Sequence, residues 1–474
     1  MPKLTRYEAI LLLLFLLTLP FSNPWVRGDG VGYYAFARSM LIEHRLDFTR
    51  DWLDANASFR LNRTTAAGEI LPDQYTSTGH LNNHFSVGPA ILWSPFLVAT
   101  HAGVLAWDGL GGHVAADGYS RPYRVAMAVS TAFYGFLGLL ISFAVASKYV
   151  AERWAFLATI GIWFASSLPV YMYFNPSWSH AQSAFVVALF LWYWLRTRGA
   201  RTWGQWVLLG ALGGLMMDVY YVAAVVLLLP LLESLAGYRA SLRGEAAEPS
   251  SQLFFKDAVF AAALAAAFLP TLIAKKIIYG SYFQMGYTES WFWYSPAFFK
   301  VCFSSDHGLF SWTPILLFAA AGLFFLRKYD RSLALYLIAV FVAYLYAMGC
   351  YQNWSGISSY GSRFFVGLTP IFVLGLAALL DWMARALQGR RAAILAWGAT
   401  VLLIAWNLGL MFQWGMHLIP DRGPISWRKA AYNEVAVVPS QAAQSVRNYF
   451  LGRRQMMERI EQQDVHGLTS TTPH

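Results

Sequence analysis

Charged residues are scarce in this chain. They make up only 13% of 474 residues, while 57% are hydrophobic, and soluble domains usually carry about a quarter charged residues. The apolar residues also form long runs, and a bilayer core of ~30 Å needs roughly 20 of them per helix. This pattern excludes a soluble globular domain and predicts an all-α polytopic membrane protein with about ten to thirteen transmembrane helices. The runs are 9–21, 90–106, 125–146, 155–173, 181–195, 206–235, 258–278, 315–326, 333–348, 364–380 and 392–411.

Cysteines and the common catalytic motifs are also missing. Cys302 and Cys350 are the only two thiols, which is too few for a disulfide framework, and we expect both to be buried as small apolar residues. The chain has no Walker loop, no Gly-x-Ser-x-Gly elbow and no His-Glu-x-x-His pair, so nucleotide-hydrolase, serine-hydrolase and zinc-protease chemistry is not supported. No Cys/His spacing indicates structural zinc.

The net charge of +10 is explained by membrane topology and not by nucleic acid, because the basic residues lie in short loops. The clusters at 196–201, 239–243, 327–331 and 385–391 are typical of cytoplasmic loops. With Lys3 and Arg6 placing the N-terminus in the cytoplasm, the first loop lies outside, and the first apolar run is a retained helix. If 148–153 is cytoplasmic as well, the run 90–106 does not cross fully, and the sequence leaves this point open.

These assignments divide the chain into a transmembrane region, 1–413, and a polar tail, 414–474. The region contains a first outer loop at 22–87, a cytoplasmic linker at 236–256 and further outer loops at 279–312 and 351–363. Within the first loop, 33–44 is amphipathic and is expected to lie along the membrane interface. Arg38, Glu43 and His44 would then stay in water. In the tail, 444–463 is either a basic amphipathic helix on the membrane surface or partly disordered.

Polar residues gather at the predicted outer ends of the helices, where ionisable groups need a partner or a function. Asp29 lies between two glycines directly after the first helix, where it serves either a turn or a ligand. Asn83 and His84 precede the second apolar run, and Arg363 precedes a later one. An arginine fork suits a phosphate with two hydrogen bonds, although it also suits lipid headgroups.

The outer loop 279–312 adds a second polar group among aromatic residues. Glu289, Asp306 and His307 belong to it, and Asp306 and His307 come just before a helix, whose N-terminus attracts anions. The segment 175–180 is a further polar interruption between two helices. We expect these distant segments to gather a carboxylate and several cations into one pocket.

Taken together, these segments resemble the GT-C superfamily of glycosyltransferases, which are polytopic enzymes using polyprenyl-phosphate sugars. The branch related to protein mannosyltransferases and aminoarabinose transferases is the most similar. The resemblance covers about residues 5–415 and rests on the order of five short motifs at outer helix ends. They are GDGVGYY at 28–34, HFSVGPA at 84–90, PSWSHA at 176–181, HGLFSWTP at 307–314 and YGSRF at 360–364.

The resemblance implies roles for the polar residues. Asp29 matches the acid that acts as general base, and Arg363, His84 and His307 are candidates to meet the phosphate of the leaving group. Candidates for a second acid or a substrate contact are Asp306, Glu289, Tyr33 and Asn83. Many relatives carry two neighbouring acids in the first loop, whereas this chain has one, so the use of a divalent metal stays open.

The resulting interpretation is an inverting glycosyltransferase of the bacterial inner membrane with its site at the periplasmic face. It would move a hexose or pentose from a polyprenyl-phosphate donor to a lipid, glycan or protein acceptor, with membrane lipids but no nucleic acid as further partners. A transporter or flippase of lipid-linked sugars would share the helices and the outer cavity, but it should show ionisable residues in mid-membrane. The chain has Asp218, Lys275 and Lys276 within apolar runs. A non-catalytic membrane scaffold is the third alternative.

Overall fold

The computed structural model describes residues 4–245, 249–387 and 390–470. Within these ranges the chain is helical, and its extended pairings are limited to three isolated bridges. This confirms the predicted all-α fold class. The helices of the first half are α1 (Arg6–Thr18), α2 (Asp29–Arg38), α3 (Thr49–Asp54), α4 (Ala57–Arg60), α5 (Gly88–Gly109), α6 (Arg121–Ala146), α7 (Glu152–Phe164), α8 (His180–Thr197), α9 (Trp203–Val219) and α10 (Leu228–Leu242).

The described residues of the second half are helical as well. Its helices are α11 (Ser250–Tyr279), α12 (Phe298–Phe303), α13 (Leu309–Trp312), α14 (Ile315–Leu326), α15 (Arg331–Cys350), α16 (Thr369–Ala386), α17 (Arg390–Gly415), α18 (Trp427–Ala436), α19 (Val438–Leu451) and α20 (Arg453–Ser470). Short 3₁₀ or π-helical segments are η1 (Leu19–Phe21), η2 (Ser39–Glu43), η3 (Pro72–Gln74), η4 (Val170–Phe174), η5 (Tyr221–Leu227) and η6 (Arg363–Leu368).

Seven described helical segments are long and apolar enough to cross a membrane, judged by length and composition: α5, α6, η5 with α10, α11, α15, η6 with α16, and α17. The expectation of ten to thirteen spans also counted runs that fold into shorter helices. Helices α1, α7 and α14 have 13, 13 and 12 residues, and at 1.5 Å per residue these are shorter than a ~30 Å bilayer core. The run 90–106, whose crossing the sequence left open, lies within the continuous helix α5, which has 22 residues.

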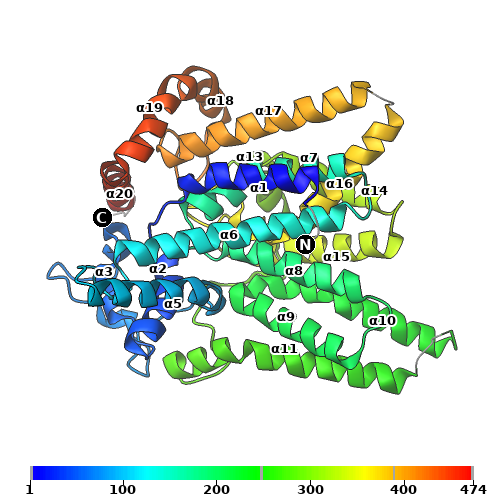
Figure 1. Cartoon of the computed structure of the whole chain (residues 1–474), viewed down its shortest axis with the longest axis horizontal. Coiled ribbons are helices and arrows are strands. Elements are labelled where there is room, and N and C mark those ends of the chain that lie inside the picture. Colours follow the sequence, from blue (N-terminus) through cyan, green and yellow to red (C-terminus); the bar gives the residue numbers. More distant parts are fainter. Residues whose placement is uncertain (1–3, 246–248, 388–389, 471–474) are drawn as a thin grey trace.

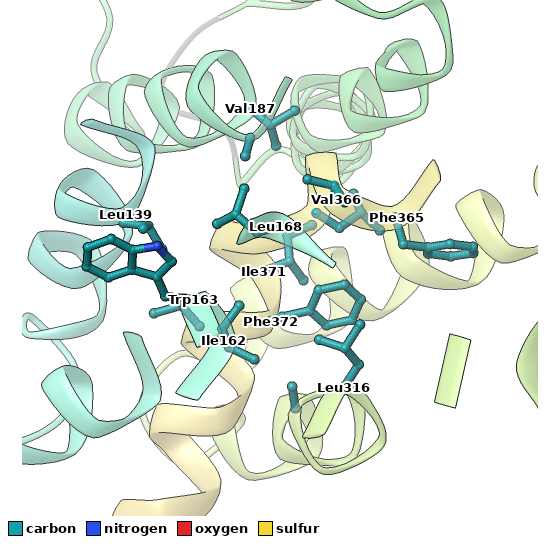
Figure 2. Packing of buried hydrophobic residues seen from close by; sticks show 14 of the residues in the cluster. Leu139, Ile162, Trp163, Leu168, Val187, Leu316, Phe365, Val366, Ile371 and Phe372 are labelled. Atoms are coloured by element: carbon teal, nitrogen blue, oxygen red, sulfur yellow. The ribbon is translucent and has the colours of Figure 1, made fainter. Parts of the chain in front are cut away.

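The long helices run roughly parallel in Figure 1, with α17 along one flank and α11 along the other. The segment 363–386 is central, since 94% of its apolar window is buried, compared with 17% for α11. Figure 2 shows the core around it, where Ile162 of α7, Leu316 of α14 and Phe372 of α16 point toward one another. Cys302 and Cys350 are both buried and free, as expected. The core therefore holds α16 in place, and with it the Arg363 segment that precedes it.

Two of the basic clusters, 196–201 and 327–331, meet at one end of the bundle. Arg198 pairs with Asp330 at 3.0 Å, and Arg201 pairs with Glu233 at 2.7 Å. Figure 1 shows α2, α3 and the C-terminal helix α20 at the other end. The outer loops are thus separated from the basic loops by the length of the helices.

Three expectations about local structure are wrong. Arg38 is buried and not in water, because its guanidinium binds both oxygens of Asp51 at 2.6 and 2.7 Å, and a bidentate pair satisfies a buried charge. The linker is shorter than 236–256, since α10 extends to Leu242 and α11 begins at Ser250. The tail segment 444–463 is not one helix, because Gly452 separates α19 from α20.

Candidate active site

A cavity of about 390 Å³ lies among the outer loops, at the end of the bundle where α2, α3 and α20 gather. Residues from the first loop, from 175–180, from both later outer loops and from the tail line it. Five of the residues singled out in the sequence share this lining: Asp29, Tyr33, His84, Glu289 and Arg363. Three others, Asn83, Asp306 and His307, do not line it.

Asp29 and Arg363 form the centre of this cavity. Asp29 begins α2, and Arg363 begins η6, the segment before the buried helix α16. Nη1 of Arg363 donates to Oδ2 of Asp29 at 2.7 Å. The guanidinium also stacks over the ring of Trp178 at 4.5 Å, which is a favourable cation–π arrangement. The side chains are 33% exposed for Asp29 and 12% for Arg363, so both the carboxylate and the cation are reachable from the cavity.

The glycines around Asp29 allow this placement. Gly28 has a φ of +53° as it turns the chain into α2, a conformation that side chains rarely adopt. A Cβ at Gly30 would lie 1.9 Å from Oγ of Ser177, so α2 packs directly against the 175–180 turn. The sequence motif therefore reflects close packing as well as chemistry.

His84 lies beside the pair, and its ring packs at a tilt against Phe85 and Tyr287 at ring distances of 4.1 and 4.7 Å. Burial lowers the pKa of His84 to about 4, although the Asp29 carboxylate opposes the shift. His84 is thus neutral at physiological pH and would act on a ligand as a hydrogen-bonding group. Its loop is held by Lys275, whose ammonium donates to the carbonyls of Asn83 and Phe85, both at 3.0 Å.

Asn83 also holds this loop against α2, since it is fully buried and its amide donates to the carbonyl of Gly32 at 2.9 Å. Tyr33, which lines the cavity, packs its ring against Phe85 at 4.7 Å. Burial raises the pKa of Tyr33, so its hydroxyl keeps its proton.

His307 lies outside the cavity wall for a conformational reason. Its backbone is left-handed, with a φ of +56°, and its side chain is buried with Nδ1 3.1 Å from the carbonyl oxygen of Ser355. Burial lowers its pKa to about 4, so it is not a cation either. Asp306 contacts the same ring at 3.4 Å, and burial raises the pKa of its carboxyl. This pair supports the 353–359 loop beneath Arg363 and does not line the site.

Arg63 is a cation of the cavity that sequence reasoning missed. It lines the wall, stacks over Phe59 at 4.2 Å and donates to the carbonyl of Phe59 at 2.8 Å. No carboxylate of the described residues lies within ion-pair distance of it. Burial lowers its pKa while Asp29 opposes the shift, and an arginine stays charged in either case. Arg63 lies in an ordinary polar loop of the sequence, and no motif there indicated a binding residue.

The tail was also missed as part of the site. Ile460, Asp464 and Leu468 of α20 line the cavity. Asp464 pairs with Arg27 and, at 3.0 Å, with Nε2 of His417. Earlier in the same helix, Glu461 accepts from the backbone N–H of Ser58 at 2.6 Å. The C-terminal helix therefore closes one side of the cavity by pairing with the first loop.

Asp218, Lys275 and Lys276, the three charges that the sequence placed inside apolar runs, lie near helix ends. Lys276 donates to the carbonyl of Gly280 at 2.7 Å; the other two lie under the cavity. Asp218 is the residue before the last of α9, and Lys275 is in the final turns of α11. Both contact the start of α5 or the loop before it: the backbone of Asp218 lies against Gly88, and Lys275 binds the 83–85 carbonyls. They belong to the packing under the cavity.

Among the described residues, no group of three or more His, Cys, Asp and Glu side chains is placed to hold a metal ion. Asp29 pairs with Arg363, and Glu289, Asp421 and Asp464 are further acids of the lining. The cavity thus offers cations, hydroxyl groups and several acids, of which Asp29 is the one paired with Arg363.

Comparisons with known proteins found similar solved structures. Neither a family model nor a curated protein matches the chain. A crystal structure of ArnT from Cupriavidus metallidurans bound to undecaprenyl phosphate is similar at 12% identity and a TM-score of 0.46, covering 86% of this chain and 70% of that one. An oligosaccharyltransferase from Archaeoglobus fulgidus, in complex with zinc and sulfate, is similar at 15% identity and a TM-score of 0.49. That match covers 85% of this chain but about half, 52%, of the archaeal protein.

The apolar helices decide the broad class. This chain is a helical, multi-pass membrane protein. Its polar cavity lies where several of those helices end, since η6 with α16 begins there at Arg363 and α17 ends there at Gly415.

Proposed function

We propose that this protein is a GT-C type glycosyltransferase that transfers a sugar from a polyprenyl-phosphate donor to an acceptor hydroxyl in the outer cavity. The observation that carries the proposal is the contact between Asp29 and Arg363 across 334 residues, inside a cavity with Arg63 and His84. An acid for the acceptor and cations for the phosphate are the two groups this reaction needs.

The reaction would be a single displacement with inversion. The acceptor oxygen forms a bond to the anomeric carbon, the bond from that carbon to the phosphate oxygen breaks, and its electron pair leaves with the polyprenyl phosphate. Asp29 takes the proton of the acceptor hydroxyl, while Arg363 and Arg63 balance the charge on the phosphate.

The carboxylate of Asp29 is bound to Arg363, and a carboxylate held this way is a poor base. We infer that the donor phosphate replaces it on the guanidinium. A phosphate oxygen at the place of the carboxylate would accept the same charge-assisted hydrogen bond from Nη1. Asp29 is then released toward the acceptor.

The outer face is proposed as the periplasmic side of a bacterial inner membrane, because the short loops with clustered basic residues lie at the opposite end of the bundle (Figure 1). The sugar is a hexose or pentose and the acceptor a lipid, glycan or protein, as in the superfamily that the motifs resemble. The transporter alternative loses support, since the charges found inside apolar runs, Asp218, Lys275 and Lys276, lie in the last turns of α9 and α11.

The test is turnover of polyprenyl-phosphate sugars in nanodiscs, followed by release of polyprenyl phosphate. Asp29→Asn should lower the rate by roughly 100-fold to 10,000-fold, as expected for loss of a general base. Asp73→Asn is the matched control, because Asp73 is an exposed acid of the same loop outside the cavity. Equal rates for Asp29→Asn and the control would remove Asp29 from the mechanism, and transfer of the donor between leaflets without its consumption would favour the transporter.

A further inference from the structure

The outer loop at 282–303, here called the aromatic loop, exposes an unusual number of large rings. Phe283 is 81% exposed, Phe299 76% and Tyr294 completely. In water such a patch is unfavourable, and contiguous exposed apolar surface marks a binding surface or a membrane contact. The other exposed rings of the loop are Tyr282, Tyr287, Trp291, Phe292, Trp293, Phe298 and Phe303.

The backbone of the aromatic loop is fixed to the end of a helix. The N–H of Phe292 donates to the carbonyl of Cys350 at 2.6 Å, and that of Ala297 donates to Gly349 at 2.8 Å. Gly349 and Cys350 end α15, which is long and apolar enough to span a membrane. The loop also follows directly on α11, another such helix. The exposed rings therefore lie at the level where two candidate spans end.

The short helix α12 within the loop has two distinct faces. Val301 and Cys302 are buried against the protein, while Phe299 and Phe303 are exposed and contact each other at a ring distance of 5.4 Å. Lys300 is exposed beside them. Aromatic rings are enriched at the boundary between lipid and water, and a lysine at that depth extends its ammonium toward phosphate headgroups.

We propose that the aromatic loop is a membrane anchor whose rings lie in the lipid headgroup layer of the outer leaflet. Its partner is the bilayer surface itself, with Lys300 on the lipid phosphates. The same loop reaches the cavity through Tyr287 and Glu289, so the site lies directly beside the headgroup layer. This surface does not depend on the proposed reaction, since it follows from the exposed rings and the two helix ends.

The experiment labels single cysteines with an environment-sensitive NBD probe and places the protein in vesicles of phosphatidylcholine and phosphatidylglycerol. Ser295→Cys is the main variant, because Ser295 is exposed within the loop and the change is nearly isosteric. Phe283→Cys is the second variant. Ala67→Cys, in an exposed turn of the first loop, is the matched control. The parent protein without an added cysteine, treated with the same probe, reports any reaction of the two buried thiols.

Probes at Ser295 and Phe283 should emit at shorter wavelength than the probe at Ala67. They should be quenched by lipids carrying a spin label near the headgroup, and protected from iodide in the water. Quenching by iodide at all three positions would overturn the proposal. So would a blue shift at Ser295 and Phe283 that is insensitive to spin-labelled lipid and grows with protein density, because this would assign the patch to a contact between protein copies.

Discussion

Replacing Asp29 or Arg363 should change the affinity for polyprenyl phosphate in opposite directions. The carboxylate of Asp29 lies 2.7 Å from Nη1 of Arg363, and Arg363 is the cation that an incoming phosphate requires. Asp29→Asn removes the competing charge and keeps the shape of the side chain. Arg363→Gln removes the cation itself. A purely structural role for the pair would instead make both variants bind more weakly.

The magnitudes follow from the geometry. A carboxylate and a phosphate roughly 5 Å apart repel by about 3 kcal/mol at an effective dielectric constant near 20, and each 1.4 kcal/mol is about tenfold in affinity. For Asp29→Asn this sets an upper limit of about 100-fold tighter binding, and a gain of several-fold is expected because Asp29 is 33% exposed to solvent. Arg363→Gln loses charge-assisted hydrogen bonds of about 1.5–3 kcal/mol, which corresponds to binding weaker by roughly 10-fold to 150-fold.

The assay is equilibrium binding of a fluorescent short-chain polyprenyl phosphate to each variant in nanodiscs, measured by anisotropy. The matching polyprenol, which lacks the phosphate, is the ligand control and should bind all variants alike. Asp73→Asn is the protein control. Weaker phosphate binding by Asp29→Asn, in a variant that keeps the melting temperature of the parent, would refute the exchange of Asp29 for phosphate on Arg363.

Four further predictions follow from the same structure. Arg63→Gln should weaken polyprenyl phosphate binding about tenfold with no effect on polyprenol in the same anisotropy assay, and equal loss for both ligands would count against a phosphate contact. Burial lowers the pKa of His84 to about 4, so between pH 6.5 and 4 the unfolded chain binds more protons than the folded protein. The free energy of unfolding should therefore fall on acidification by up to about 1.4 kcal/mol per pH unit. His84→Gln should reduce this pH dependence when stability is measured by thermal unfolding. Asp464→Asn removes the pairing of α20 with Arg27, worth about 1 kcal/mol, and should speed hydrogen exchange in 453–470 roughly fivefold; unchanged exchange would show that other contacts hold the helix. Lys275→Met leaves two loop carbonyls unpaired and should lower stability by about 1–3 kcal/mol, with faster hydrogen exchange around residue 84.

Hydrophobic patterning was sufficient to predict the fold class. Scarce charge and repeated apolar runs are local properties, and each run has to form a helix because backbone groups in lipid have no other hydrogen-bond partners. The length of each helix was less predictable. Polar residues such as Ser166 and Ser167 interrupt the run 155–173, so that it folds as α7 and the separate segment η4.

Part of the site could also be predicted, since Asp29, His84 and Arg363 come directly before or after apolar runs, and helix ends on one side of a bundle come together. The protonation state of the histidines could not be predicted from the sequence. His84 and His307 were expected to be cations, but burial lowers the pKa of both to about 4, and burial is a property of the packed molecule. His307 also lies outside the cavity, since its ring is buried against the carbonyl oxygen of Ser355.

The amino-acid sequence alone determined that this protein is a bundle of membrane helices with its polar chemistry collected at one end, because both features depend on short stretches of chain. Tertiary structure decided which charges meet. Asp29 pairs with a residue 334 positions away, and Arg27 with Asp464, 437 positions away. Such contacts depend on the crossing of packed helices and on the return of the C-terminal helix over the first loop, and no local pattern of residues encodes either.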